Sequence, residues 1–215
     1  MLGDAMEIWL VRHAVTEANL EGRLQGQLEY PLSKEGRKQA FALARRLKKQ
    51  PFCAFFSSDL QRTKETSYLI SSLQKGPHPL YSSLLREYCF GKIQGLTKKE
   101  IRARDPRLAA CLQHDFYHTE IPGAEGLPGL FRRVRVFYHF LSRFAEKNSP
   151  SRPVLVVSHG RFLQAFVIHF LKYDLREPWP FSFSPASLTI LEGNFKNKRR
   201  LKLFNDTCHL KWPVR

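Results

Sequence analysis

The stretch Ile8-Trp9-Leu10-Val11-Arg12-His13-Ala14-Val15-Thr16-Glu17-Ala18-Asn19 places an arginine and a histidine directly after a short apolar run. An apolar run of this length predicts a buried strand over 8–11. In open α/β sheets, ligands bind beyond the carboxyl ends of the strands, and this is where Arg12 and His13 fall. A fixed cation beside an imidazole suits an anionic ligand, so the stretch predicts an anion site at the edge of a sheet.

A second histidine follows another apolar run late in the chain. The β-branched stretch 154–157 (VLVV) predicts a buried strand, and it is followed by Ser158-His159-Gly160. If the two strands run parallel in one sheet, His13 and His159 leave the sheet at the same edge. We therefore expect the two imidazoles to belong to one site.

The rest of the chain alternates between expected helices and strands. Helices are predicted from Ser33, from Ser58-Asp59 to about Leu73, from the capping box Thr97–Glu100 to about Gln113, and over the apolar positions from Leu130 to Phe144. Further strands are predicted over 54–57, 79–82, 188–192 and 201–205, with the last two as a hairpin. This alternation predicts an α/β fold, a three-layer α/β/α sandwich around a mostly parallel mixed sheet. We expect a single domain over 1–215 with a short helical insertion at about 92–125.

The chain carries a strong positive charge, because 35 Lys and Arg residues against 19 Asp and Glu residues give a net charge of +16. Such a surface attracts anions. Part of the charge lies in the run 196–202, which we interpret as a solvated hairpin turn. Nucleic-acid binding is the alternative, and it is not favoured because no nucleic-acid signature motif accompanies the run.

The sequence lacks the patterns of a signal peptide, a membrane-spanning helix, a disulfide framework and a metal site. The start of the chain has no basic residue before its apolar run, and no window approaches the apolar length of a spanning helix. The cysteines are widely separated, without a Cys-x-x-Cys pair. We therefore expect a cytoplasmic protein that does not enter a membrane. His114 and His118 have no third ligand nearby, so no metal is expected; no motif indicates an oligomeric state.

Six residues form the candidate constellation, namely Arg12, His13, Asn19, Arg62, Glu87 and His159. Each alone has an ordinary structural explanation, such as a solvated arginine or a loop carboxylate. Together they suit phosphoryl transfer through a covalent histidine, because a neutral imidazole can attack phosphorus while arginines hold the equatorial oxygens. A carboxylic acid can then protonate the departing alkoxide. Arg62 also falls in the first turn of its expected helix, where a bound anion offsets an unfavourable cation.

Blocks spread over nearly the whole chain resemble the histidine phosphatase superfamily, also called phosphoglycerate mutase-like. LVRHAVTEAN (10–19) resembles its Arg-His-Gly motif, GRLQG (22–26) its substrate loop, and PLSKEGRKQA (31–40) the start of its first helix. SSDLQRTKET (57–66) carries its second arginine, LREYCFGKIQGLT (85–97) its proton donor, and PGAEG (122–126) its Gly-Glu-Ser segment. VLVVSHG (154–160) resembles the strand with its second histidine, and NDTCHL (205–210) its closing motif.

The resemblance implies a role for each matching residue. His13 would be the phosphorylated nucleophile, Glu87 the proton donor, and His159 a stabiliser of the transition state. Arg12, Asn19 and Arg62 would hold the phosphate, and Thr16, Gln25, Gly26 and Gly160 would line the pocket. Members of this branch use no metal or other cofactor, and the resemblance implies a small phosphorylated substrate.

The chain departs from the family pattern at Ala14, where glycine is usual, at Gly126, where serine is usual, and in its short insertion. The short insertion favours a phosphatase over a 2,3-bisphosphoglycerate-dependent phosphoglycerate mutase, because a mutase must keep water from its phosphohistidine. The mutase stays an alternative, and a binding protein with an inactive site is a third hypothesis. The substrate itself is not indicated by any motif.

Overall fold

The computed structural model describes residues 5–116, 118–148, 150–174, 179–195 and 197–210. Its centre is a six-stranded sheet with the order β3-β2-β4-β1-β5-β6. The strands are β1 (Met6–Arg12), β2 (Ala54–Ser58), β3 (Leu80–Ser82), β4 (Val154–Ser158), β5 (Leu188–Gly193) and β6 (Arg199–Asp206). β1, β2, β3 and β4 are parallel, whereas β5 runs antiparallel to both β1 and β6. The predicted mostly parallel, mixed sheet is therefore confirmed.

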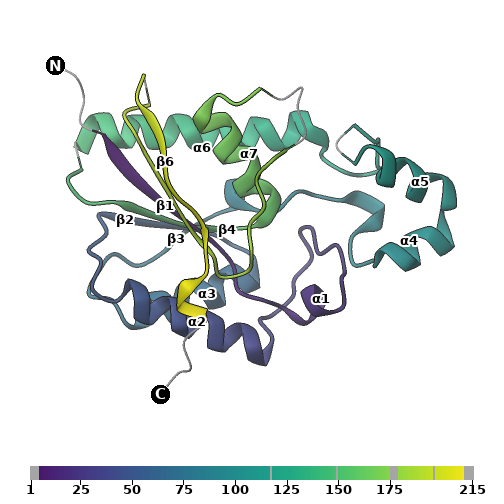
Figure 1. Cartoon of the computed structure of the whole chain (residues 1–215), viewed down its shortest axis with the longest axis horizontal. Coiled ribbons are helices and arrows are strands. Elements are labelled where there is room, and N and C mark those ends of the chain that lie inside the picture. The colour runs from purple at the N-terminus through teal and green to yellow at the C-terminus, as the bar shows by residue number, and fades with distance from the viewer. Residues whose placement is uncertain (1–4, 117, 149, 175–178, 196, 211–215) are drawn as a thin grey trace.

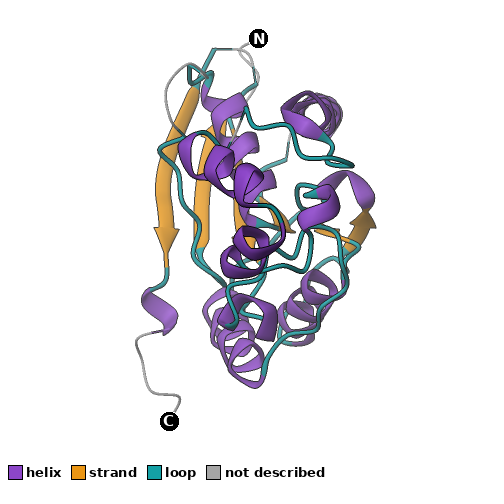
Figure 2. Cartoon of the chain, turned by 90° about the vertical axis from the view of Figure 1, so that its right-hand side faces the viewer, coloured by secondary structure: helices purple, strands orange, loops and turns teal. Residues whose placement is uncertain are grey.

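Helices cover both faces of this sheet (Figure 1). The helices are α1 (Glu17–Leu20), α2 (Lys34–Leu47), α3 (Gln61–Ser72), α4 (Lys98–Arg104), α5 (Pro106–His114), α6 (Gly126–Asn148) and α7 (Gly160–Leu171). α6 and α7 lie on one face and α2 and α3 on the other, while α4 and α5 extend from one end of the molecule (Figure 1). Figure 2 shows β6 as the outermost strand at one edge. The layers are those of the expected α/β/α sandwich.

Successive side chains of each strand point to opposite faces of the sheet, and they pack into a separate hydrophobic core on each face. Leu10 and Val156 point to the face where they pack with Phe166 of α7, whereas Val11 points to the other face and packs with Leu43 of α2. Strands buried on both faces give continuous apolar runs, which is why the sequence of β4 has no polar alternation. The two layers fix β1 and β4 firmly, and these are the strands that carry the histidines.

The single helix predicted from Thr97 to about Gln113 is wrong, because two helices occupy this segment. The capping box of Thr97 and Glu100 starts α4 as predicted. Asp105 then leaves the helical conformation and caps α5, its carboxylate accepting from the Leu108 amide at 2.9 Å. Pro106 stands at the first position of α5, where its missing N–H costs nothing. The Asp-Pro pair therefore ends one helix and starts the next.

The predicted cap of α3 is also wrong, although Ser33 caps α2 as expected. The residue before α3 is Leu60, which makes no side-chain cap hydrogen bond. Asp59 instead pairs with the Arg86 guanidinium at 2.7 Å, and the Ser58 hydroxyl faces His159 at 2.8 Å. Both polar side chains are used by tertiary contacts rather than by the helix.

The C-terminal hairpin is confirmed by the antiparallel pairing of β5 with β6. The basic run 196–202 spans the end of this hairpin and the start of β6, with Lys196 outside the described residues. Within the described part of the chain, no helix is long and apolar enough to cross a membrane.

Candidate active site

The two histidines emerge side by side from neighbouring strands. Arg12 of β1 stands opposite Ser158 of β4 in the parallel register, so the next residue in each strand is a histidine. The His13 amide donates to the Ser158 carbonyl at 2.9 Å, and the two imidazole centroids are 5.2 Å apart. The prediction that both histidines leave the same edge of the sheet is confirmed.

His13 is held in one tautomer. Its Nδ1 lies 2.7 Å from the Ala14 carbonyl oxygen, which can only accept a hydrogen bond, so Nδ1 carries the proton. Nε2 then keeps its lone pair. Burial lowers the pKa of His13 well below 6.5, and the positive charges of Arg62 and Arg12 lower it further. The imidazole is therefore neutral at pH 7, with its free nitrogen available to attack an electrophile.

Arg62 is fully buried in the first turn of α3. Its Nη1 donates to the Leu28 carbonyl at 2.8 Å and its Nη2 to the Gly26 carbonyl at 2.6 Å. Burial lowers its pKa to about 10, so the guanidinium stays charged at neutral pH. Two fixed carbonyls thus orient a cation that cannot move toward solvent. Its Nε has no hydrogen-bond partner among the described residues.

Arg12 supplies a second oriented guanidinium. Its Nη1 donates to the Phe183 carbonyl, and its buried Nε has no partner within the described structure. A Cβ built on Gly160 would lie 3.6 Å from the Arg12 Cζ, so the start of α7 passes directly beside this group. Buried donors without acceptors are uncommon in proteins. The unpaired N–H groups of Arg12 and Arg62 therefore mark a place for an anion.

Glu87 reaches the site from the loop before Gly91. Its Oε1 accepts from the backbone amides of Tyr88, Arg161 and Phe162 at 2.8, 3.1 and 3.3 Å. Its Oε2 accepts from the Arg161 amide at the longer distance of 3.3 Å. The carboxyl group is therefore anchored through one oxygen to the first turn of α7, and the second oxygen is less constrained.

His159 is fully buried. Its Nε2 lies 2.8 Å from the Ser58 hydroxyl, whereas its Nδ1 is buried without a partner in the described residues. Burial, followed by the charge of Arg62, lowers the pKa of His159 well below 6.5. The ring is thus neutral, with one nitrogen fixed by β2 and the other unused by the protein.

Thr16 and Asn19 form a capping box at the start of α1, a short helix that the sequence reading missed. The Asn19 Oδ1 accepts from the Thr16 amide at 3.1 Å and from its hydroxyl at 3.0 Å. This leaves the Asn19 amide nitrogen for another acceptor. Thr16 is fully buried and contributes to the position of Asn19 rather than to the cavity wall.

A cavity of about 240 Å³ joins most of these groups. Its wall includes eight of the ten predicted site residues, namely Arg12, His13, Asn19, Gln25, Gly26, Arg62, Glu87 and Gly160. Thr16 and His159 lie behind the wall. No cluster of three or more potential metal ligands occurs among the described residues.

The sequence reading missed several residues in the wall. Arg23 and Arg161 line the cavity together with Gln164, Ser182 and Phe183. Arg161 directly follows Ser158-His159-Gly160, and Arg23 lies within 22–26. Both are therefore adjacent to segments that were predicted to form the site, and this adjacency could have identified them. Ser182 and Phe183 come from the segment before β5, where no local pattern points to a site.

Known proteins are similar to this chain in sequence and in architecture. Residues 8–207 match the family model of the histidine phosphatase superfamily, branch 1. The chain is 31% identical over 205 residues to phosphoserine phosphatase 1 of Hydrogenobacter thermophilus, which covers 95% of this chain and 94% of that one. It is 36% identical over 167 residues to a metal-independent phosphoserine phosphatase of Arabidopsis thaliana, covering 77% and 68% of the two chains.

A solved structure agrees with these matches. The native mycobacterial glucosyl-3-phosphoglycerate phosphatase superposes with a TM-score of 0.81 at 31% identity, covering 94% of this chain and 99% of that one. Family model, relatives and fold lead to one conclusion: the chain belongs to branch 1 of the histidine phosphatase superfamily and is a phosphomonoester hydrolase.

Proposed function

We propose that this enzyme hydrolyses a small phosphomonoester without a metal, through a phosphohistidine formed on the Nε2 of His13. One observation carries the proposal: the Nδ1 of His13 is tied to the Ala14 carbonyl at 2.7 Å, which leaves the Nε2 of a neutral imidazole free. Arg12 and Arg62 border the same cavity as His13. A dianionic phosphate can be held there by two arginines while the imidazole attacks.

In the first step, Nε2 of His13 bonds to phosphorus as the P–O bond to the leaving alcohol breaks. Glu87, in its carboxylic acid form, gives its proton to the departing alkoxide. In the second step, water attacks phosphorus, the P–N bond breaks, and the Glu87 carboxylate accepts the proton of the water. Free phosphate leaves, and His13 and Glu87 return to their starting forms.

The remaining site residues act on the charge of the transferred group. Arg12, Arg62 and the amide nitrogen of Asn19 bind its oxygens, and the unpaired Nδ1 of His159 stabilises the transition state. Thr16 holds Asn19 through the capping box. Gln25, Gly26 and Gly160 shape the wall.

We infer that the alcohol part of the substrate carries its own negative charge. Arg161 lines the catalytic cavity beyond the arginines assigned to phosphate, and so does Arg23, whose guanidinium is paired with Glu21 and Glu100. Arg161 and Leu24 also border an adjoining groove, whose wall includes Lys98, Lys99 and Arg102. Phosphoserine and glucosyl-3-phosphoglycerate, named for the related enzymes, both keep a carboxylate on the part that leaves. An anionic leaving group would reach these additional cations.

The decisive experiment traps the intermediate. We expect rapid quenching with a ³²P-labelled substrate to yield a protein-bound phosphate that is labile in acid and stable in alkali, which is the behaviour of phosphohistidine. His13→Ala should abolish the label and lower kcat by at least about 10⁴-fold. The fold should survive, because the change removes no apolar core side chain. Wild-type enzyme treated with a chelator should keep its full activity.

Activity of His13→Ala within tenfold of wild type would contradict the covalent step, and rescue of a chelated enzyme by a divalent ion would contradict the metal-free site.

The mutase alternative is tested with 3-phosphoglycerate, with and without 2,3-bisphosphoglycerate. We expect phosphate release to exceed formation of 2-phosphoglycerate. Isomerisation outrunning phosphate release by tenfold would replace the hydrolase assignment for this substrate.

We also infer that the enzyme works in a reducing compartment, the cytoplasm. Its four cysteines, Cys53, Cys89, Cys111 and Cys208, are all free thiols. Proteins of oxidising compartments more often pair their cysteines in disulfides.

A further inference from the structure

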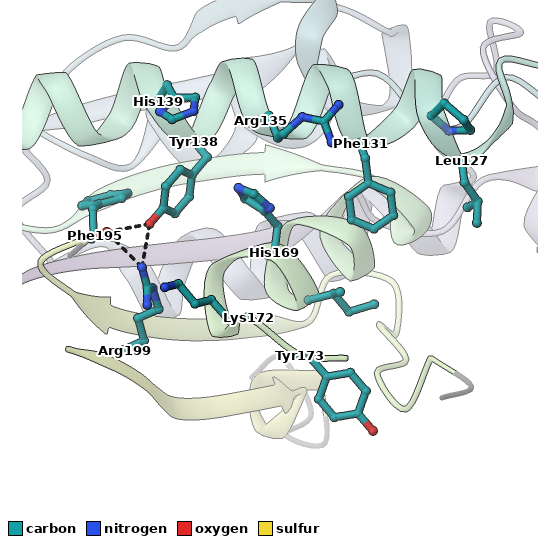
Figure 3. Close-up of a pocket in the computed structure, with 12 residues that line it drawn as sticks. Leu127, Phe131, Arg135, Tyr138, His139, His169, Lys172, Tyr173, Phe195 and Arg199 are labelled. Carbon is teal, nitrogen blue, oxygen red and sulfur yellow. Dashed lines mark hydrogen bonds between the residues drawn. The ribbon is translucent and has the colours of Figure 1, made fainter. Parts of the chain in front are cut away.

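A second cavity of about 620 Å³ lies between α6, α7 and the β5–β6 hairpin. Figure 3 shows its lining side chains, and we call it the α6–α7 pocket. None of its lining residues lines the catalytic cavity. Its volume lies within the range of pockets that enclose small organic ligands. The proposed reaction uses none of these side chains, so the pocket needs a separate explanation.

The polar lining of the α6–α7 pocket is made largely of basic side chains. Five basic side chains line it, namely Arg135 and His139 of α6, His169 of α7, Lys172 directly after α7, and Arg199 of β6. No aspartate or glutamate is among the lining residues. Within the described residues, none of these five side chains forms a salt bridge with a carboxylate. The charges of Arg135, Lys172 and Arg199 therefore add to one another.

His169 reports the resulting electrostatic potential. Burial lowers its pKa, and the charges of Arg135, His139 and Arg199 lower it further. The ring also packs edge-on against Tyr138, with centroids 4.8 Å apart. A bound anion would reverse the effect of the cations, so the pocket favours a negatively charged occupant.

Arg199 is the most firmly held of the cations. Its Nη2 donates to the Phe195 carbonyl at 3.0 Å and lies 3.4 Å from the Tyr138 hydroxyl, as the dashed lines in Figure 3 show. Its Nε is buried and has no acceptor among the described residues. A fixed guanidinium with an unsatisfied donor is the arrangement that also marks Arg12 and Arg62.

The lining mixes cationic and apolar side chains. Arg199 lies beside Phe195, and Arg135 lies beside Phe131 on α6 (Figure 3). Ile168 adds to the apolar lining. A ligand that matches this lining carries both an anionic group and an apolar body.

Backbone conformation gives an independent indication that this wall serves a ligand. Lys172 and Phe195 have φ angles of 56° and 60°, in the left-handed region that disfavours side chains. Lys172 directly follows α7, at the position where glycine is usual. Strained non-glycine residues concentrate at binding sites, where the side chain is retained despite its conformational cost. Both side chains line the pocket.

We propose that the α6–α7 pocket binds a small amphipathic organic anion, with an aromatic or aliphatic body and a terminal sulfonate, phosphate or carboxylate. The anionic group contacts the cations of the lining, Arg135, Lys172 and Arg199, and the body packs on Phe131. This site is separate from the phosphoryl-transfer site, and its occupant is not the substrate.

The test uses 8-anilinonaphthalene-1-sulfonate, whose fluorescence rises in apolar surroundings, with orthovanadate present at saturation to fill the catalytic cavity. We expect saturable binding that vanadate does not remove. Arg135→Gln should weaken it about fivefold to tenfold, as expected for the loss of one charged contact. Arg132→Gln is the matched control, since Arg132 is exposed on the same helix and does not line the pocket. The affinity of this variant for the probe should equal that of wild type.

Lys172→Gly separates a binding role from a structural one. Glycine accepts the left-handed conformation without strain, so the midpoint of thermal unfolding should stay level or rise while affinity for the probe falls. Loss of probe binding on addition of vanadate, or equal affinity in wild type, Arg135→Gln and Lys172→Gly, would overturn the proposal.

Competition then tests the shape of the ligand. 1-Naphthalenesulfonate should displace the probe, whereas the neutral 1-naphthalenemethanol and inorganic sulfate should each require concentrations at least about tenfold higher, because the first lacks the charge and the second lacks the apolar body. Equal displacement by the neutral ring would show that the cations do not select the ligand and would overturn the proposal.

Discussion

The catalytic cavity and the α6–α7 pocket both gather cations, but they hold them differently. In the catalytic cavity Arg62 is fully buried and donates to two backbone carbonyls. In the α6–α7 pocket Arg135 of α6 and Lys172, directly after α7, are exposed, whereas Arg199 donates to a backbone carbonyl. A charge that must stabilise a transition state has to be oriented before the reaction, whereas a charge that only attracts a ligand can remain mobile.

The origin of this difference lies in the elements that carry each site. Residues just beyond strand ends inherit the rigidity of a sheet that is packed on both faces. This is why His13 and His159 lie side by side with their rings 5.2 Å apart. Helix surfaces place side chains less firmly. We therefore expect substitutions in the catalytic cavity to have far larger effects on turnover than surface substitutions of the same chemistry.

Arg62→Gln gives the largest effect expected from this comparison. Removing an oriented cation from a buried phosphate site should lower kcat/KM by about 10³-fold. Arg62→Lys should recover little, because an ammonium group cannot donate to both carbonyls and the phosphate in the same geometry. Steady-state kinetics with p-nitrophenyl phosphate measures the loss.

Arg37→Gln is the matched control, since Arg37 is exposed on α2 in an ion pair with Glu65. Its kcat/KM should stay within about twofold of wild type, in line with the small contribution of surface ion pairs. Equal losses in the two variants would mean that burial and orientation of the arginine do not matter for the reaction.

Glu87→Gln is expected to have the next largest effect, and one that depends on the substrate. Glutamine keeps the side chain's shape but cannot give up a proton. Turnover of an alkyl phosphate should fall about 10²-fold or more, whereas an aryl phosphate, whose leaving oxide scarcely needs protonation, should lose less than about tenfold. The measurement is kcat for both substrates in parallel. A uniform loss would remove Glu87 from the role of acid.

The catalytic edge could be predicted from sequence because its signals are local. The apolar runs before His13 and His159 are continuous, and their parallel pairing follows from the alternation of helices and strands. The first-turn position of Arg62 was likewise readable from the end of β2. Positions that follow a buried strand directly can be located to within a residue.

The remaining features depend on tertiary contacts. Ser58 was expected to cap a helix, but its hydroxyl faces His159, which lies 101 residues later in the chain. The break between α4 and α5 was missed although Pro106 was visible, because the capping role of Asp105 became apparent only from its conformation. The α6–α7 pocket combines side chains from three elements, and none of them stands in a motif.

The smallest expected effect concerns stability and returns to the two buried histidines. Burial keeps His13 and His159 neutral in the folded chain, with pKa values well below the ordinary 6.5. Below pH 6.5 the unfolded chain binds protons at these positions that the folded chain does not, so the free energy of unfolding decreases as the pH falls. Each histidine should contribute a slope that approaches about 1.4 kcal/mol per pH unit as the pH falls well below 6.5. Urea unfolding from pH 7 to pH 5 measures the slope, and His13→Gln should reduce it by the share of one histidine.

His78→Gln is the control, because His78 is exposed before β3 and its replacement should leave the slope as in wild type. His169, which is only half-buried in the α6–α7 pocket, should have a weaker influence than either catalytic histidine, because solvent reaches its ring. A slope that His13→Gln leaves unchanged would show that His13 takes up its proton without opposing the fold, and the catalytic edge would then be as adaptable as the helix surface.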